Sequence, residues 1–189
     1  IYTEDLAETF LENMDPFKFY YDTHVAYRLL EKGKLPPHAC GHWNIVTGSS
    51  LMGCYGIGFL HAGDPEAARR DALELSYHYQ RGFDTHAAGI LAAACAAALV
   101  PGATVDSVID AAIEAAPEAP QPVFDATQPR SAREILRRAV DAAAGCDVFA
   151  ARQKLYDAFY AYNGQDPWEV VAYALGIFKA SGGDVWQAA

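Results

Sequence analysis

Apolar and polar positions repeat with a helical period through most of the chain. The clearest stretch covers residues 48–99, where short polar breaks separate three runs built mainly from Gly, Ala, Ser and Leu. The pattern predicts helices over 49–62, 66–79 and 86–99. The last run has no polar face, which is typical of a helix buried on all sides. We therefore expect it to be the central helix.

Capping residues mark the helix boundaries inside this stretch. Gly63 is expected to end the first helix in a left-handed conformation, and Asp64 and Pro65 to begin the second. Asp84 or Thr85 is expected to cap the central helix.

The first helix of this stretch contains an unusual number of glycines. Gly53, Gly56 and Gly58 lie in its interior, and each costs about 1 kcal/mol relative to Ala. The glycines therefore predict that a neighbouring segment or a ligand approaches the backbone closely.

The rest of the chain also follows helical patterns. Further helices are expected to begin at Thr3, Asp15–Pro16, Thr104, Ser131, Asp147, Asp166 and Asp184. The aromatic residues of 15–33 indicate burial on more than one side, whereas Pro36–Pro37 excludes a helix at the start of loop 34–47. Prolines also make 117–129 irregular.

No segment shows sustained strand alternation. We predict an all-α fold, a single compact bundle of about eight or nine helices, forming one domain over residues 1–189.

Charge and hydropathy exclude two classes of partner. The net charge of −10 argues against binding to nucleic acid, which depends on Lys and Arg. No apolar run reaches the roughly 18 residues of a membrane span. The widely spaced Cys40, Cys54, Cys95 and Cys146 are expected to be reduced, as in a cytoplasmic protein.

The two ends suggest a longer polypeptide. Ile1 is not an initiator Met, and residues 184–189 resemble the first turn of a helix without its continuation. We expect the chain to be the middle part of a larger protein, truncated at both ends.

Candidate chemistry gathers beside the central helices. Ser49 and Ser50 begin the Gly-rich helix, where free N–H groups and the helix dipole favour an anion such as phosphate; alternatively, the serines only cap the helix. His78 falls in the last turn of the next helix, and Asp84 and His86 begin the central one. These positions predict one polar pocket, open between Ser50 and His78.

Two other polar groups have simpler alternatives. His38, Cys40 and His42 alternate along the loop, and His and Cys are typical zinc ligands. A fourth ligand at a known spacing is missing, so a partly buried loop without a metal is the competing interpretation. An acidic helical stripe could bind a cation or form a solvated face: Asp106, Asp110 and Glu114.

The central stretch resembles the ADP-ribosylglycohydrolase family, in particular its dinitrogenase reductase-activating glycohydrolase-like members. The similarity lies in GSSLMGCYGIGFLHAGDPEAARRDALELSYHYQRGFDTHAAGILAAACAAAL. It consists of a small-residue turn entering a helix, a Gly-Asp-Pro helix start, a helix that ends near a His, and a long Ala-rich helix. Flanking segments extend the resemblance over nearly the whole chain: TEDLAETFLENM, AYRLLEKGKLPP, LVPGATVDSVIDAA and VVAYALGIFKASGGDVWQAA.

The resemblance implies an all-α hydrolase that uses two Mg²⁺ ions to cleave the N-glycosidic bond between ADP-ribose and an acceptor such as arginine. The substrate would be an ADP-ribosylated protein or a small ribosyl compound. The family's paired aspartates lie in terminal segments that this chain lacks, so we assign no metal ligand and no catalytic residue. We expect Mg²⁺-dependent activity of the full-length protein and none of this chain alone.

The resemblance also assigns substrate-lining roles to Ser49, Ser50, Met52 and His78. Asp84 joins them because of its place at the start of the central helix. Ser49–Ser50 replaces the family's common Asn-Gly turn, which allows a substrate other than ADP-ribosyl-arginine. Two alternatives stay open: a non-catalytic helical scaffold or ligand-binding protein, and a lyase or hydrolase that uses His38, Cys40 and His42.

Overall fold

A computed structural model describes residues 1–15, 17–18, 20–44, 47–121, 130–159 and 166–189. Helices dominate these ranges, which contain no strand and one isolated antiparallel bridge between Gln121 and Arg130. The predicted all-α class is confirmed. Some predicted features lie outside the described residues: Tyr162, which the pattern of the helix from Asp147 places on the inward face, Phe19, one of the aromatic residues expected to be buried, and most of the proline-rich segment. The single domain over 1–189 stays a prediction.

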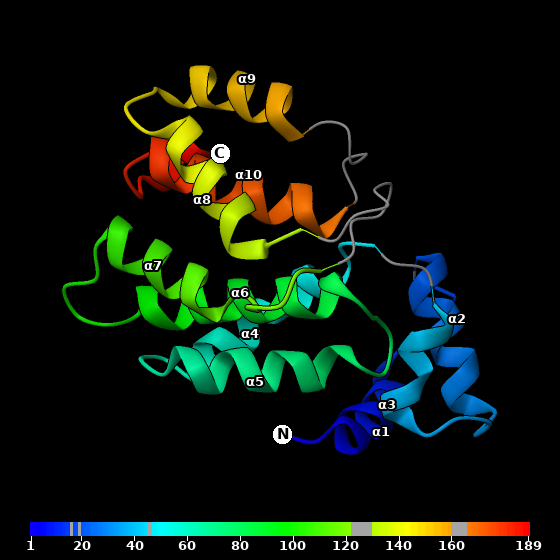
Figure 1. The fold of residues 1–189 in the computed structure, drawn as a ribbon. Helices are drawn as coiled ribbons and strands as arrows, with labels where there is room; N and C mark the ends of the chain where they lie inside the picture. Colours follow the sequence, from blue (N-terminus) through cyan, green and yellow to red (C-terminus); the bar gives the residue numbers. More distant parts are fainter. Residues whose placement is uncertain (16, 19, 45–46, 122–129, 160–165) are drawn as a thin grey trace.

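Figure 1 shows how the helices are arranged along the chain. In chain order they are α1 (Thr3–Asn13), α2 (Tyr21–Glu31), α3 (Pro37–Cys40), the 3-10 helix η1 (Gly41–Trp43), α4 (Ser50–Leu60), α5 (Pro65–Ser76), α6 (Phe83–Ala98), α7 (Val105–Ala115), α8 (Ala132–Ala143), α9 (Val148–Phe159), α10 (Pro167–Ala180) and α11 (Val185–Ala188).

Helix α6 is the centre of the main core. Thirteen of its 16 residues are buried, and Figure 1 shows it between the α4–α5 pair and the group α8–α10. At its start, the Phe83 ring stacks on Trp168 of α10 with 3.8 Å between ring centroids. The predicted central helix is therefore confirmed.

Small residues let α4 pack closely on α6. A Cβ at Gly58 would lie 2.5 Å from the Cys95 Cβ and 2.8 Å from the Ala92 carbonyl oxygen. Gly56 faces open space, and Gly53 has only an ordinary contact with Leu75. Close approach of a neighbour thus accounts for one of the three glycines.

Most predicted boundaries of the central helices are correct. Gly63 has a φ of +86°, and the Asp64 carboxylate accepts a hydrogen bond from the Ala67 N–H at 3.0 Å. The expected cap of α6 is wrong, because Gly82 precedes the helix in a left-handed conformation. Its positive φ suits glycine, and it leaves Asp84 free to turn into the core.

The segment before α4 differs more from expectation. Helix α2 begins at Tyr21 rather than at 15–16, and the aromatic residues expected to be buried, Phe17, Tyr20 and Tyr21, are exposed. Residues 34–47, predicted as a loop, contain α3 and η1. Pro37 is compatible with α3 because the first helical position needs no N–H donor.

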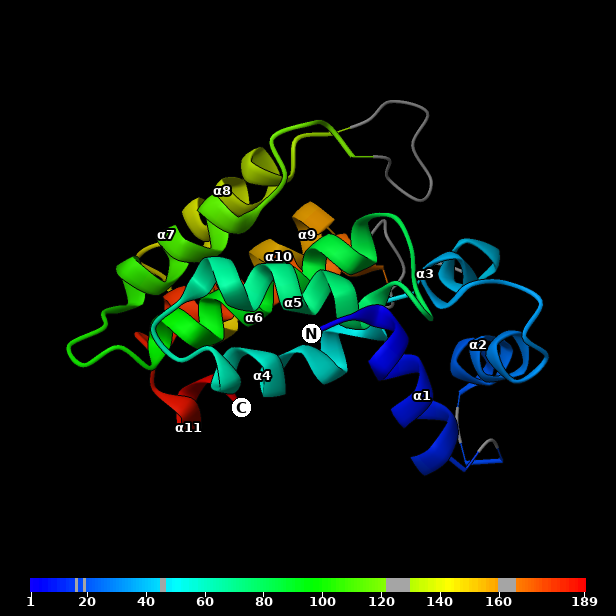
Figure 2. The same cartoon turned by 90° about the horizontal axis from the view of Figure 1, so that it is seen from below.

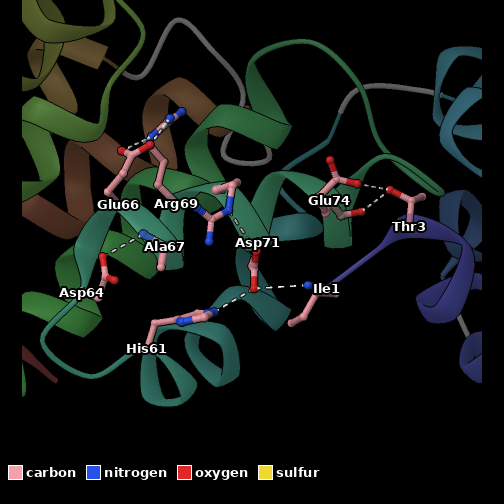
Figure 3. A network of polar contacts seen from close by, with 10 residues as sticks. Ile1, Thr3, His61, Asp64, Glu66, Ala67, Arg69, Asp71 and Glu74 are labelled. Carbon is pink, nitrogen blue, oxygen red and sulfur yellow. Dashed lines mark hydrogen bonds and ion pairs between the residues drawn. The ribbon is translucent and has the colours of Figure 1, made fainter.

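Helices α1–α3 form a separate group at one end of the molecule, with a small core of Ala7, Leu30 and Cys40. Figure 2 shows α1 beside α4. Thr3, expected to begin the first helix, donates its hydroxyl to the Glu74 carbonyl oxygen on α5 at 3.0 Å (Figure 3). On the same face of α5, the buried Asp71 carboxylate lies 2.8 Å from His61 Nε2.

Candidate functional site

The buried carboxylate of Asp22, at the start of α2, is hydrogen-bonded to residues just before α4 and just after the end of α5. Asp22 is 1% exposed, and its Oδ2 accepts hydrogen bonds from Thr47 Oγ1 at 2.8 Å, Gln80 Nε2 at 2.9 Å and the Ser49 hydroxyl. Burial raises the pKa of Asp22, but the hydrogen bonds from Ser49 and Thr47 outweigh it and hold the pKa below its ordinary value. The carboxylate is therefore ionised at neutral pH.

Backbone contacts hold this cluster in place. Asn44 Nδ2 donates to the carbonyl oxygens of Asp22 and Tyr79, at 2.7 and 2.8 Å. Gly41 packs so closely on the end of α5 that a Cβ there would collide with the Gln80 carbonyl. Asn44 and Gly41, in the segment before α4, therefore fix the position of Asp22 relative to the backbone of Tyr79 and Gln80.

A second buried carboxylate lies on the other side of the same turn. Asp84 is fully buried, and its Oδ2 accepts from Ser50 Oγ at 2.8 Å and from the Ser50 N–H at 3.3 Å. Its other oxygen has no hydrogen-bond partner. Burial raises the pKa of Asp84 to about 7, and the nearby charges of Asp22 and Asp166 add to the shift.

Tyr79 and His78 continue this cluster at the end of α5. Burial raises the pKa of the Tyr79 hydroxyl, and the nearby Ser50 side chain opposes this shift; the Tyr79 ring centroid lies 4.9 Å from that of His78. Burial lowers the pKa of His78 to about 4, although the Leu75 backbone opposes the shift. Neither ring nitrogen of His78 has a partner within normal hydrogen-bond geometry. His78 is therefore neutral at pH 7.

Two hollows border the start of α4. The first, here called the Asp22 hollow, has a volume of about 460 Å³ and is lined by Tyr20, Asp22, Thr47, Gly48, Ser49, Leu51, Met52, Tyr55 and Val170. The second, the His78 hollow, has about 430 Å³ and is lined by Leu6, Thr9, Phe10, Asn13, Met14, Thr23, Ser49, Met52, Gly53, Leu75, His78 and Tyr79. Ser49 and Met52 border both hollows. Volumes in this range are typical of small-molecule sites.

The structure divides the predicted lining residues into two sets. Ser49, Met52 and His78 border the His78 hollow. Ser50 and Asp84 line neither hollow and are fully buried. The predicted open cleft between Ser50 and His78 is wrong, because Tyr79 contacts both residues. A role for Ser50 and Asp84 would therefore be positioning rather than contact.

The predicted anion site at the start of α4 is also wrong. The N–H groups of Ser49 and Ser50 donate to Thr47 Oγ1 and to the Asp84 carboxylate, while those of Leu51 and Met52 donate to carbonyls in the turn. Neither serine caps the helix with its side chain. Two carboxylates therefore occupy the place expected for phosphate.

Metal ligands do not converge in the described part of the chain. It contains no group of three or more His, Cys, Asp or Glu side chains that could hold a metal ion. In the loop singled out for zinc, His38 lies 3.5 Å from Glu4, whereas the Cys40 thiol points to the carbonyls of Leu35 and Pro36. The described residues therefore fit neither a zinc site nor a dinuclear magnesium centre.

The acidic stripe and the cysteines have no role in the two hollows. Asp106, Asp110 and Glu114 are exposed, and Asp106 pairs with Lys179 at 2.5 Å. All four cysteines are free. No helix among the described residues combines the length and hydropathy of a membrane span.

Comparison with known proteins identifies the family. The fold and the two hollows define an all-α protein with ligand-sized surface sites. The model of the ADP-ribosylglycohydrolase family matches residues 2–189. The chain belongs to this family, and membership indicates an ADP-ribosylglycohydrolase-like hydrolase. No curated protein matches the chain, and no solved structure matches it either.

Sequence reasoning missed Asp22, Thr47 and Gln80. Asp22 has the signature of an ordinary acidic residue in the first turn of a helix. Thr47 and Gln80 lie in connections without a helical period. Only the closure of α2, α4 and α5 around one point brings these three residues together, and no local pattern could have shown it.

Proposed function

We propose that this chain forms the substrate-lining part of a hydrolase that cleaves the N-glycosidic bond of an ADP-ribosyl or related ribosyl group. The observation that carries the proposal is the family match over residues 2–189. The geometry supports it: Ser49 and Met52, at the start of α4, and His78, just after the end of α5, border one hollow of about 430 Å³. The expected substrates are ADP-ribosylated proteins or small ribosyl compounds.

The roles of the lining residues follow from their environment. A neutral imidazole can donate one hydrogen bond and accept another, and neither ring nitrogen of His78 has a partner within normal hydrogen-bond geometry. Met52 is 75% exposed, and its flexible apolar side chain can adapt to a bound group. Ser49 is held by Asp22 and cannot turn away from the hollow without breaking that hydrogen bond.

Hydrolysis under this proposal requires the metal centre that the resemblance to the family implies. The described residues do not fit a two-magnesium site, so we derive no step through magnesium. The same observation favours a second candidate function, a helical protein that binds a ribosyl ligand without cleaving it.

Release of ADP-ribose from an ADP-ribosylated protein tests both candidates. The assay is run with and without Mg²⁺, on this chain and on a longer polypeptide that contains it. We expect turnover by the longer polypeptide only, and only with Mg²⁺. Binding of ADP-ribose without turnover by either polypeptide would favour the non-catalytic function. Turnover by this chain alone would contradict the assignment of the missing chemistry to other segments.

A further inference from the structure

The turn between α8 and α9 brings a thiol and an amine into contact. Cys146 lies in this turn and Lys154 lies on α9, and the Lys154 Nζ is 3.1 Å from the Cys146 Sγ. Figure 1 shows the turn at the opposite end of the molecule from α1–α3. Neither residue lines the Asp22 hollow or the His78 hollow. The pair is therefore separate from the candidate site described above.

Ordered backbone holds both members of this pair. The Cys146 N–H donates to the Ala143 carbonyl at the end of α8, at 3.1 Å. The Asp147 carboxylate accepts a hydrogen bond from the Ala150 N–H at 2.8 Å, which fixes the start of α9, and Lys154 lies inside that helix. A bond between the two side chains therefore requires changes in their torsion angles and no movement of a helix.

The Lys154 amine is not engaged by a carboxylate. Among the residues with a described position, no Asp or Glu lies within ion-pair distance of its Nζ. The Lys154 side chain is exposed, and its Nζ instead contacts the Cys146 sulfur. The amine is therefore placed beside the sulfur without competition from an acidic neighbour.

The other three thiols are protected from oxidation. Cys40 and Cys54 are fully buried. Burial raises the pKa of Cys40 and of Cys95, and it raises that of Cys54 to about 12. Peroxides oxidise the thiolate form of cysteine, and susceptibility follows exposure. Of the four thiols, the half-buried Cys146 is therefore the one that a peroxide is expected to oxidise first.

We propose that Cys146 and Lys154 form a reversible covalent bridge when the chain is exposed to a peroxide. In the first step the Cys146 sulfur attacks one oxygen of hydrogen peroxide, the O–O bond breaks, and the products are a sulfenic acid and water. In the second step the neutral Lys154 amine attacks the sulfenic sulfur. An S–N bond forms, and the sulfenic hydroxyl leaves with one amine proton as a second water molecule. The thiol is oxidised by two electrons and the peroxide is reduced, so the second step needs no further oxidant.

The bridge protects Cys146 from irreversible damage. Sulfenic acids condense with nearby nitrogen to sulfenamides, but without such a partner they are oxidised further to sulfinic acid, which thiols do not reverse. A thiol reductant that attacks the sulfur of the bridge would restore both Cys146 and Lys154. This inference goes beyond the hydrolase proposal, because it concerns a modification site outside both hollows and holds whether or not the chain cleaves a substrate.

Peroxide treatment of the purified chain, followed by tryptic digestion and mass spectrometry, tests the proposal. Trypsin cleaves after Arg152 and Lys154 of the reduced chain and releases the peptide 139–152. The bridge blocks cleavage after Lys154, so 139–152 should stay attached to 153–179, with a mass lower by two hydrogen atoms than that of the two peptides. Dithiothreitol should separate them. Sulfinic acid at Cys146 with normal cleavage after Lys154 would overturn the proposal, and so would a disulfide from Cys146 to another cysteine.

Two variants that keep the charge give a matched comparison. Lys154→Arg replaces the amine by a guanidinium, which is a much weaker nucleophile; we expect no bridge and several-fold faster formation of Cys146 sulfinic acid. Lys179→Arg makes the same exchange at the lysine that pairs with Asp106 and should form the bridge as the natural chain does. A bridged product in Lys154→Arg, or equal rates of sulfinic acid formation in both variants, would contradict the proposal. Hydrolase activity enters none of these measurements, so the two proposals fail separately.

Discussion

Two buried residues with opposite pKa shifts make the pH dependence of stability a sharp test of the site. The pKa of Asp84 is raised to about 7, so between about pH 4 and 7 the folded chain keeps a proton that the unfolded chain releases. Acidification through this window therefore stabilises the fold. His78, with its pKa lowered to about 4, has the opposite effect, because below pH 6.5 the unfolded chain binds a proton that the folded chain does not.

The two effects largely cancel in the natural chain, and Asp84→Asn removes only one of them. The variant should become less stable relative to the natural chain as the pH falls from 7 to 5, by roughly 2 to 3 kcal/mol. Urea unfolding at each pH measures the difference. Asp141→Asn, which changes an exposed carboxylate, should give a curve parallel to that of the natural chain. A parallel curve for Asp84→Asn as well would mean that Asp84 stays ionised in the folded state down to pH 5, which would contradict its raised pKa.

At the same scale, the sequence predicts which residues matter better than what they do. Asp84 and Ser50 are singled out by position, but as a cap and as a ligand contact. The structure pairs them with each other because Gly82 takes over the start of α6. The hydrogen-bond partner of such a side chain cannot be assigned from its neighbours in the sequence, because it depends on which helix packs against it in the folded chain.

The close packing of α4 on α6 requires glycine at one position of α4 and only tolerates it at another. Gly58→Ala would place a methyl group against Cys95 and the Ala92 carbonyl of α6, and overpacking of this kind typically costs about 1 to 3 kcal/mol. Gly56 lies two residues earlier on the same helix and faces open space. Gly56→Ala should therefore stabilise the chain by roughly 0.5 to 1 kcal/mol.

Thermal unfolding of the two variants checks this prediction, each serving as the control of the other. Opposite signs are expected, because both changes add the same methyl group to α4. A loss of stability in Gly56→Ala of the size expected for Gly58→Ala would indicate that a neighbour covers the outer face of α4.

Helices with a strong hydrophobic pattern are predictable from the sequence, because the pattern alone shows which face is buried. Helix α6 is recognisable from its uninterrupted apolar composition, and α5 from the sequence Gly63–Asp64–Pro65 before it. The elements before α4 are hard to predict from the sequence, because they lack such a pattern. Short helices such as α3 have too few residues for a period, and the group α1–α3 is held by contacts that are distant in sequence, such as that between Thr3 and Glu74.

The molecule as a whole consists of a large core around α6 and a small group, α1–α3, attached to it through few contacts. The attachment includes Asn44, which donates to the Asp22 and Tyr79 carbonyls, and the Asp22 network that forms the floor of one hollow. Because few apolar residues of this group are buried, among them Ala7, Leu30 and Cys40, its local stability should depend strongly on these links. The shape of both hollows therefore depends on the docking of α1–α3.

Loss of Asn44 should loosen this group without unfolding the rest. In Asn44→Ala two carbonyl acceptors lose their donor, at a cost of about 1 to 3 kcal/mol, and amide hydrogen exchange in α1 and α2 should become faster. The amides of α6 should be unaffected, since its contacts with α4, α5 and α10 stay intact. Asn13→Ala, which removes only an exposed hydrogen bond to the Thr9 carbonyl, is the matched control and should leave the exchange of α2 unchanged. If Asn44→Ala accelerated exchange equally in α2 and α6, the two parts would unfold together and the hollows would open only on global unfolding. Faster exchange confined to α1 and α2 would mean instead that this group opens without global unfolding; a ligand that binds only when α1–α3 are docked would then slow the exchange of α1 and α2.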